Sequence, residues 1–188
     1  MGRYSLRDKD KRPWKFDDVN SIDLDRHALQ SDPDLLLGLH IPGRFDKVLN
    51  LEECWLQEDP CIGILGSVRD FSIRNNLRMY STRTHSGYLR NLVIRRAANT
   101  NELMVNLVTS EDRPDILRNL SAFLCDRYPI ITTIVNNISQ RKAQIAVGET
   151  EKVYFGPGYI SEKIENTIFR ISANSCFQTN THQAERLY

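Results

Sequence analysis

Hydrophobic and polar positions divide this 188-residue chain into a polar beginning and a long patterned remainder. Residues 1–34 are rich in charged side chains and lack sustained periodicity, so we expect a polar segment with at most one edge strand. The run LLLGLH, Leu35–His40, is a candidate buried strand, and Lys47–Leu51 is its expected antiparallel partner. From Pro60 to about Tyr80, apolar residues at three- and four-residue spacing indicate a helix, with Asp59 as N-cap.

The clearest strand pattern covers Tyr88–Arg96 and Glu102–Thr109, which alternate, contain many β-branched residues and are joined by the short polar link AANTN. We therefore expect a hairpin. Alternation places Tyr88 and Arg90 on one face and Leu89 on the other, so neither face is purely apolar. A sheet of this kind can keep one partly solvated side for a polar partner.

The second half of the chain predicts another helix and several short strands. An apolar stripe from Ile116 to Leu124 predicts the helix, with Asp112 as its cap and Pro129 just after its end. Ile130–Ile138 reads as a strand, and shorter strands separated by glycine-rich turns continue to Ser172. The order of elements predicts an α+β fold with a mostly antiparallel sheet and flanking helices.

The closing stretch FRISANSCFQTNTHQAERLY combines a strand, a polar turn and the beginning of a helix. Asn180 is the expected N-cap, with Gln183 three residues later in a capping-box arrangement. A helix of about eight residues is unstable alone in water, so we expect it to fray or to be supported by a neighbouring molecule. At the junction, Phe177 and Gln178 could stack on a flat ring and bind its edge or a carboxylate. The alternative is that Phe177 is core and Gln178 a turn residue.

Composition narrows the class of protein. Hydrophobic residues make up 40% of the chain and charged residues 26%, as in folded soluble proteins. The net charge of +1 means that a nucleic-acid partner would need a local basic face. No apolar run approaches the roughly 20 residues of a membrane span, and the charged N-terminus does not resemble a signal peptide. We expect a cytoplasmic protein without a membrane partner.

Motifs for self-contained catalysis or metal binding are absent from the sequence. The four cysteines, Cys54, Cys61, Cys125 and Cys176, form no C-x-x-C pair and have no His-x(3–5)-His partner, so we expect reduced thiols and no metal site. The sequence has no dinucleotide-binding, phosphate-loop, serine-hydrolase or zinc-protease motif, and its four histidines are scattered. We predict no catalytic residues within this chain.

Three stretches resemble one enzyme family. Phe169–Tyr188 resembles the signature F-x-I-S-P-x-S-F-F-Q-x-N-x-x-Q-A-E-x-L-Y of the S-adenosylmethionine-dependent RNA uracil-5-methyltransferases, which make 5-methyluridine in ribosomal and transfer RNA. Leu37–Gln57 resembles the family's early hairpin, and His85–Thr109 resembles its H-x-G-x-L-R-x-L-V-x-R block. The stretches follow the family's order and span about four-fifths of the chain.

The resemblance implies a division of the chain and a function. Residues 35–172 would form the central α+β domain, residues 173–188 the start of the methyltransferase domain, and residues 1–34 a polar N-terminal segment. The doubly wound catalytic domain, with its nucleophilic cysteine and general base, would lie beyond this chain. The chain alone would therefore be inactive, and S-adenosylmethionine would bind the full-length enzyme rather than this part.

The resemblance also implies roles for three residues. Gln178 would contact S-adenosylmethionine, Phe177 would lie beside the target uracil, and Arg90 would face RNA, with ribosomal RNA as the first expectation and transfer RNA as the alternative. The sequence departs from the signature at Ala173, which replaces a proline, and at Cys176, which replaces a phenylalanine. We expect Cys176 to be small and buried.

Cys54 falls where cluster-bearing relatives have the last of four iron–sulfur ligands. The other three ligands are missing, so we expect no cluster.

Two alternative hypotheses for the function of the chain stay open. The first is a free-standing RNA-binding module that uses Arg90, Arg95 and Arg96. The second is a structural domain in which these arginines are only solvated.

Overall fold

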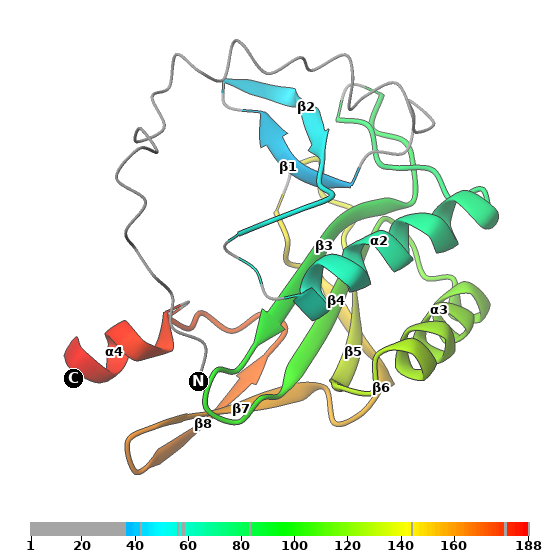
Figure 1. Cartoon of the computed structure of the whole chain (residues 1–188). Coiled ribbons are helices and arrows are strands. Elements are labelled where there is room, and N and C mark those ends of the chain that lie inside the picture. Colours follow the sequence, from blue (N-terminus) through cyan, green and yellow to red (C-terminus); the bar gives the residue numbers. More distant parts are fainter. Residues whose placement is uncertain are drawn as a thin grey trace.

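The computed structural model describes residues 37–41, 43–55, 57, 59–82, 84–143, 145–178 and 180–187. The described elements are, in chain order, β1 (Gly38–Ile41), β2 (Arg44–Asn50), α2 (Asp59–Arg74), β3 (Leu89–Arg96), β4 (Leu103–Thr109), α3 (Pro114–Arg127), β5 (Ile131–Ile138), β6 (Thr150–Phe155), β7 (Tyr159–Ile164), β8 (Thr167–Ser172) and α4 (Thr181–Leu187). The α+β class is confirmed (Figure 1). The expected segment 1–34 and the beginning of the first predicted strand lie outside the described residues.

The centre of the fold is a four-stranded sheet in the order β3-β4-β5-β6. The β3–β4 hairpin is antiparallel, as predicted, and β5 pairs with β6 in the same way. The middle pair, β4 and β5, is parallel. Helix α3 connects the two strands and returns the chain to the end of the sheet at which β4 began. Two smaller antiparallel pairs, β1–β2 and β7–β8, complete the described sheets, so the expected mostly antiparallel character holds.

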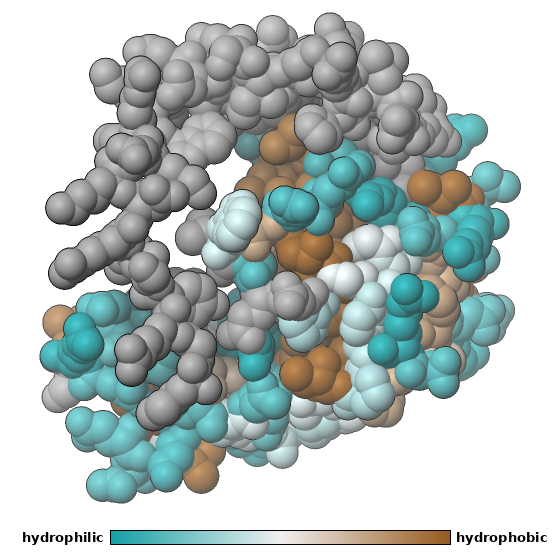
Figure 2. All heavy atoms as spheres, viewed as in Figure 1, coloured by the Kyte–Doolittle hydropathy of each residue, from teal (hydrophilic) through white to brown (hydrophobic). Residues whose placement is uncertain are grey.

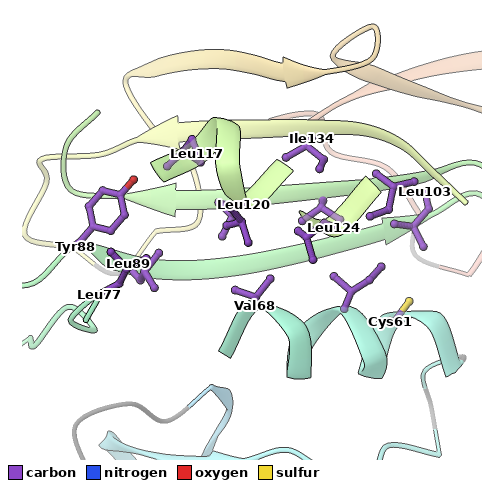
Figure 3. Close-up of a cluster of buried hydrophobic side chains, with 14 residues drawn as sticks. Cys61, Val68, Leu77, Tyr88, Leu89, Leu103, Leu117, Leu120, Leu124 and Ile134 are labelled. Atoms are coloured by element: carbon purple, nitrogen blue, oxygen red, sulfur yellow. The ribbon is translucent and has the colours of Figure 1, made fainter. Parts of the chain in front are cut away.

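Helices α2 and α3 cover one face of the central sheet. Their buried residues, including Ile64, Val68, Leu120 and Leu124, meet β4 and β5 residues in the main hydrophobic core (Figure 3). The two helices pack closely where Gly63 of α2 faces Tyr128, since a Cβ at Gly63 would lie 2.8 Å from the Tyr128 hydroxyl. The same face of the sheet is therefore sealed by two helices, which leaves the opposite face for other contacts.

The predicted alternation along β3 is wrong at its first residues. Leu89 pairs with Thr109 but Asn91 pairs with Val108, so Arg90 is the extra residue of a β-bulge. A bulge shifts the side-chain alternation by one position. Leu89 therefore joins the helix-covered core with Leu92 instead of pointing to the opposite face.

Three local expectations are corrected. The first predicted strand is not buried, because Leu39 of β1 is 61% exposed on a two-stranded hairpin. Helix α2 ends at Arg74 rather than near Tyr80; Asn76 follows with φ of +49°, a left-handed residue that ends the helix. Asp112 is not the cap of α3: the N-cap position is Arg113, and no side chain caps the helix.

The β7–β8 hairpin packs on the other face of the central sheet. Ile160 of β7 and Ile171 of β8 form a second core cluster with Met104 of β4 and Val135 of β5. The free edge of β7 is covered by the turn between β3 and β4: Glu102 accepts the Ser161 N–H at 2.7 Å, and Asn99 and Thr100 donate to β7 carbonyls. Side chains thus replace a neighbouring strand along this edge.

The last helix is capped as predicted. Asn180 Oδ1 accepts the Gln183 N–H at 3.0 Å, which is the expected N-cap bond. The expectation that α4 would fray or need another molecule is wrong for its first half. Thr181 and Ala184 are buried, 6% and 3% exposed, against the same chain, whereas Leu187 is 74% exposed.

Candidate functional site

Phe177 and Gln178 lie between β8 and α4, on what we name the connecting segment (residues 173–178 and 180). The Phe177 ring is half-buried against the second core cluster, and its centroid lies 5.7 Å from that of Phe169 at 54°. Gln178 is exposed. The structure therefore combines the two readings of Phe177, which is anchored in a core yet retains accessible surface, while Gln178 projects away from it.

The exposed Gln178 suits one part of a cofactor site. Its carboxamide offers two N–H donors and an acceptor oxygen, which match the carboxylate and amino groups of a methionine moiety. One exposed side chain cannot enclose a ligand of that size. A complete S-adenosylmethionine site would therefore need further residues around Gln178.

Arg90, the bulge residue of β3, is engaged by its own chain. Its guanidinium lies 3.9 Å from the centroid of the Tyr80 ring and donates to the Ser139 carbonyl at 3.2 Å and to the Ala143 carbonyl at 2.8 Å. These contacts tie β3 to the loop that follows β5. The Arg90 contacts thus hold the loop of residues 139–143, in which the side chains of Arg141 and Lys142 are exposed.

The contribution of the Arg90 contacts to the free energy of unfolding can be measured by replacing Arg90. Arg90→Ala should lower the free energy of unfolding by about 2 kcal/mol, because two charge-assisted hydrogen bonds and a cation–π contact are lost. Arg90→Lys should lose less, since it keeps the charge. Urea unfolding followed by circular dichroism measures both. Lys142→Ala, which removes an exposed cation from the same loop, should change stability by less than about 0.5 kcal/mol. Equal losses of stability in the two alanine variants would contradict a stabilising role of the Arg90 contacts.

The other two arginines of β3 also bind protein groups. Arg95 donates to the Ser175 carbonyl at 2.7 Å, and Arg96 donates to Asn101 Oδ1 at 2.6 Å. Arg95 thereby links the central sheet to the connecting segment. Because Arg95 and Arg96 are neighbours on a strand, their side chains point to opposite faces, and the three arginines do not form one basic surface.

A buried carboxylate near the connecting segment was not predicted from the sequence. Glu162 of β7 is 1% exposed and accepts hydrogen bonds from the Ala98 and Asn99 amides and from the Thr181 hydroxyl. These three partners are 19 to 64 residues away in sequence, so no short motif contains them; the adjacent Lys163 N–H also donates to Glu162, at 2.9 Å. Only the alternation of β7, which puts a glutamate on the same face as Ile160, could have drawn attention to it.

A shallow depression on the helix side is lined by Pro114, Arg118, Lys152, Val153 and Tyr154. The Asp112 carboxylate pairs with Lys152 and accepts the Tyr154 hydroxyl at 2.9 Å. The Lys152 hydrogen bond lowers the pKa of Asp112, and burial together with the Asp112 hydrogen bond raises the pKa of Tyr154 to about 12. Arg118 pairs with Asp115. Both cations of the depression are thus neutralised, and we assign it no ligand.

The cysteine thiols are free, but one lies where we did not expect it. Cys176 is exposed, not buried, because Phe177 rather than Cys176 turns toward the second core cluster. Cys61 is buried, and burial raises the pKa of its thiol. Among the described residues, no three His, Cys, Asp or Glu side chains gather as a metal site, and no described helix is long and apolar enough to span a membrane.

Comparison with solved structures identifies the fold. The crystal structure of Pyrococcus abyssi tRNA (uracil-54, C5)-methyltransferase in complex with S-adenosyl-L-homocysteine superposes with a TM-score of 0.63 at 24% sequence identity. The match covers 80% of this chain and 35% of that one. The described α+β arrangement is therefore one that occurs within a larger methyltransferase.

Comparison of sequences shows which proteins are homologous to the chain. An uncharacterized RNA methyltransferase of Chlorobaculum tepidum is 42% identical over 167 residues, which cover 88% of this chain and 35% of the relative. An uncharacterized RNA methyltransferase of Bacteroides thetaiotaomicron is 32% identical over 189 residues, covering 99% of this chain and 38% of the relative. No family model matches. Over most of its length the chain is homologous to these RNA methyltransferases, and it spans about a third of their length.

Proposed function

We propose that this chain is the RNA-positioning part of an S-adenosylmethionine-dependent enzyme that methylates C5 of uridine in ribosomal or transfer RNA. The observation that carries the proposal is the 42% identity to an RNA methyltransferase over 88% of the chain. The similarity of the fold to a tRNA (uracil-54, C5)-methyltransferase, together with the signature-like stretch Phe169–Tyr188, supports the uridine C5 assignment.

Within this proposal the three residues named from the sequence have distinct roles. Gln178, which is exposed, contacts S-adenosylmethionine, and Phe177 lies beside the target uracil with its other side held in the core. Arg90 contributes to RNA binding through the loop of residues 139–143 that its guanidinium holds. S-adenosylmethionine would supply the methyl group, and we assign no catalytic residue to this chain.

The division of the chain also remains part of the proposal. Residues 35–172 form the central domain and residues 173–188 lead into the methyltransferase domain. We place the enzyme in the cytoplasm, where its RNA substrates and its four free thiols would both be expected.

Fusion to a relative's catalytic part tests the proposal. We would join residue 188 to the segment that follows the matched region in the Chlorobaculum tepidum relative and supply unmodified ribosomal or transfer RNA with labelled S-adenosylmethionine. We expect 5-methyluridine, identified by mass spectrometry of the nucleosides, from the fusion and none from the 188-residue chain alone. A different methylated nucleoside would contradict the uridine C5 assignment. Methyl transfer by the chain alone would contradict the absence of catalytic residues.

The free-standing RNA-binding hypothesis is distinguished by binding alone. It relies on a basic face of Arg90, Arg95 and Arg96, yet each of these side chains binds protein acceptors in the structure. Tight binding of structured RNA by the 188-residue chain, with affinity falling steeply as salt rises, would favour that hypothesis.

A further inference from the structure

The connecting segment is tethered to the central sheet at its beginning. Asn174 donates to Asn137 Oδ1 at 3.1 Å, and Asn137 in turn donates to Asn106 Oδ1 at 3.0 Å, so a row of amides runs from β4 across β5 to the segment. The Arg95 guanidinium binds the next carbonyl, that of Ser175, at 2.7 Å. Two side chains of the central sheet therefore hold Asn174 and Ser175, two to three residues before Phe177.

A second tether lies after Gln178, where α4 begins. Glu162 Oε2 accepts the Thr181 hydroxyl at 2.8 Å and the Ala98 N–H at 2.6 Å, and Oε1 accepts the Asn99 N–H at 3.0 Å. One carboxylate thus joins three parts of the chain: β7, the turn between β3 and β4, and the first residue of α4. Asn99 adds a bond of 2.7 Å to Glu185, one turn further along the helix.

The hold on α4 is mainly polar. The helix has seven residues, too few for stability alone, and only Thr181 and Ala184 are buried. In Figure 2 the region of α4 and the β7–β8 hairpin is mainly hydrophilic, with isolated hydrophobic residues. Burial of an alanine methyl adds little, whereas hydrogen bonds to a buried carboxylate are strong, and their loss leaves the buried Thr181 hydroxyl unpaired.

We propose that Glu162 is a positioning residue that fixes the connecting segment, and with it Gln178, relative to the central sheet. Arg95 and Asn137 fix the near end of the segment and Glu162 the far end, so that the exposed Gln178 is presented from a tether on each side. Glu162 itself is 1% exposed, so we assign it no direct contact with cofactor or RNA. The consequence for catalysis rests on the proposed function, but the anchoring is a property of this chain alone.

Hydrogen–deuterium exchange of the 188-residue chain tests the anchor without cofactor or RNA. Glu162→Ala should raise amide exchange at least about tenfold in residues 97–99 and 181–187, because the Ala98 and Asn99 amides and the Thr181 hydroxyl lose their acceptor. Exchange in β4 and β5 should remain as in the wild type. Glu162→Gln should give a smaller rise, since a carboxamide oxygen still accepts. Glu165→Gln, an exposed change on the same hairpin, is the matched control and should change nothing.

A second variant separates the bond from Glu162 to α4 from its bonds to the turn between β3 and β4. Thr181→Val keeps the side-chain shape but removes the hydroxyl, so exchange should rise in residues 181–187 and not in residues 97–99. This variant also serves if Glu162→Ala fails to fold. A rise of equal size throughout β4 and β5 in the Glu162 variants would show a role in global stability only, and unchanged exchange in α4 would show that no anchor exists. Either result would overturn the proposal while leaving the methyl-transfer test unaffected.

Discussion

Gly87→Ala should destabilise the protein by at least about 3 kcal/mol, enough to unfold much of a marginally stable domain. Gly87 has φ of +120°, where residues with a Cβ are strained. A Cβ there would lie 2.1 Å from the Met79 carbonyl oxygen and 2.7 Å from the Tyr80 Cα. These are backbone atoms and cannot rotate away. Urea unfolding should show a lower midpoint, or no folded baseline.

The clash at Gly87 has a consequence for Arg90. The Tyr80 N–H donates to the Leu89 carbonyl at 2.7 Å, so displacing the backbone at Tyr80 would also move the ring on which the Arg90 guanidinium lies. Gly43→Ala is the matched control, because Gly43 also has positive φ, +75°, but nothing lies within 4 Å of the position of its Cβ. It should cost about 1 kcal/mol, from backbone strain alone. Losses of equal size in both variants would mean that strain, rather than close approach, makes Gly87 necessary.

The elements of this fold were largely predictable, because local periodicity encodes them. The β3–β4 hairpin, helix α3 and strand β8 follow from alternation or three-to-four spacing, and the Asn180 cap follows from residue chemistry. Which strands pair with each other, and where a strand is irregular, could not be predicted in this way. The parallel pairing of β4 with β5 depends on where α3 packs, and the bulge at Arg90 depends on the register with β4. Neither leaves a pattern within a single segment.

The candidate site was predictable only as far as its motif extends. Phe177 and Gln178 could be selected because they stand at a strand-to-helix junction within a recognisable stretch. Nothing local revealed that Arg90 and Arg95 would bind carbonyls 49 to 80 residues away, since a strand arginine reads equally well as solvated. Cys176 was misplaced for a related reason. Which of two adjacent side chains turns inward depends on the cluster that receives it, here the one that takes Phe177.

Leu124→Ala should lower the free energy of unfolding by about 3 kcal/mol, because it deletes buried methyl groups and leaves a cavity in a layer that cannot fully close. Leu124 of α3 is 0% exposed and belongs to the main hydrophobic core, to which α2 and the central sheet also contribute (Figure 3). Leu187→Ala makes the same chemical change on α4, where the side chain is 74% exposed, and should cost less than about 0.5 kcal/mol. Urea unfolding of the two variants compares burial directly.

The Leu124 variant also predicts a change in thiol reactivity. Cys61 belongs to the same core cluster, is 4% exposed and has a pKa raised by burial, so it reacts only when this layer opens. Since 1.4 kcal/mol is a tenfold change in an equilibrium, alkylation of Cys61 under native conditions should accelerate on the order of 100-fold. Exposed Cys176 should react at an unchanged rate and is the internal control. Slow alkylation of Cys61 together with the full loss of stability would contradict opening of the helix layer as a single unit, because the cavity would then be relieved around α3 alone.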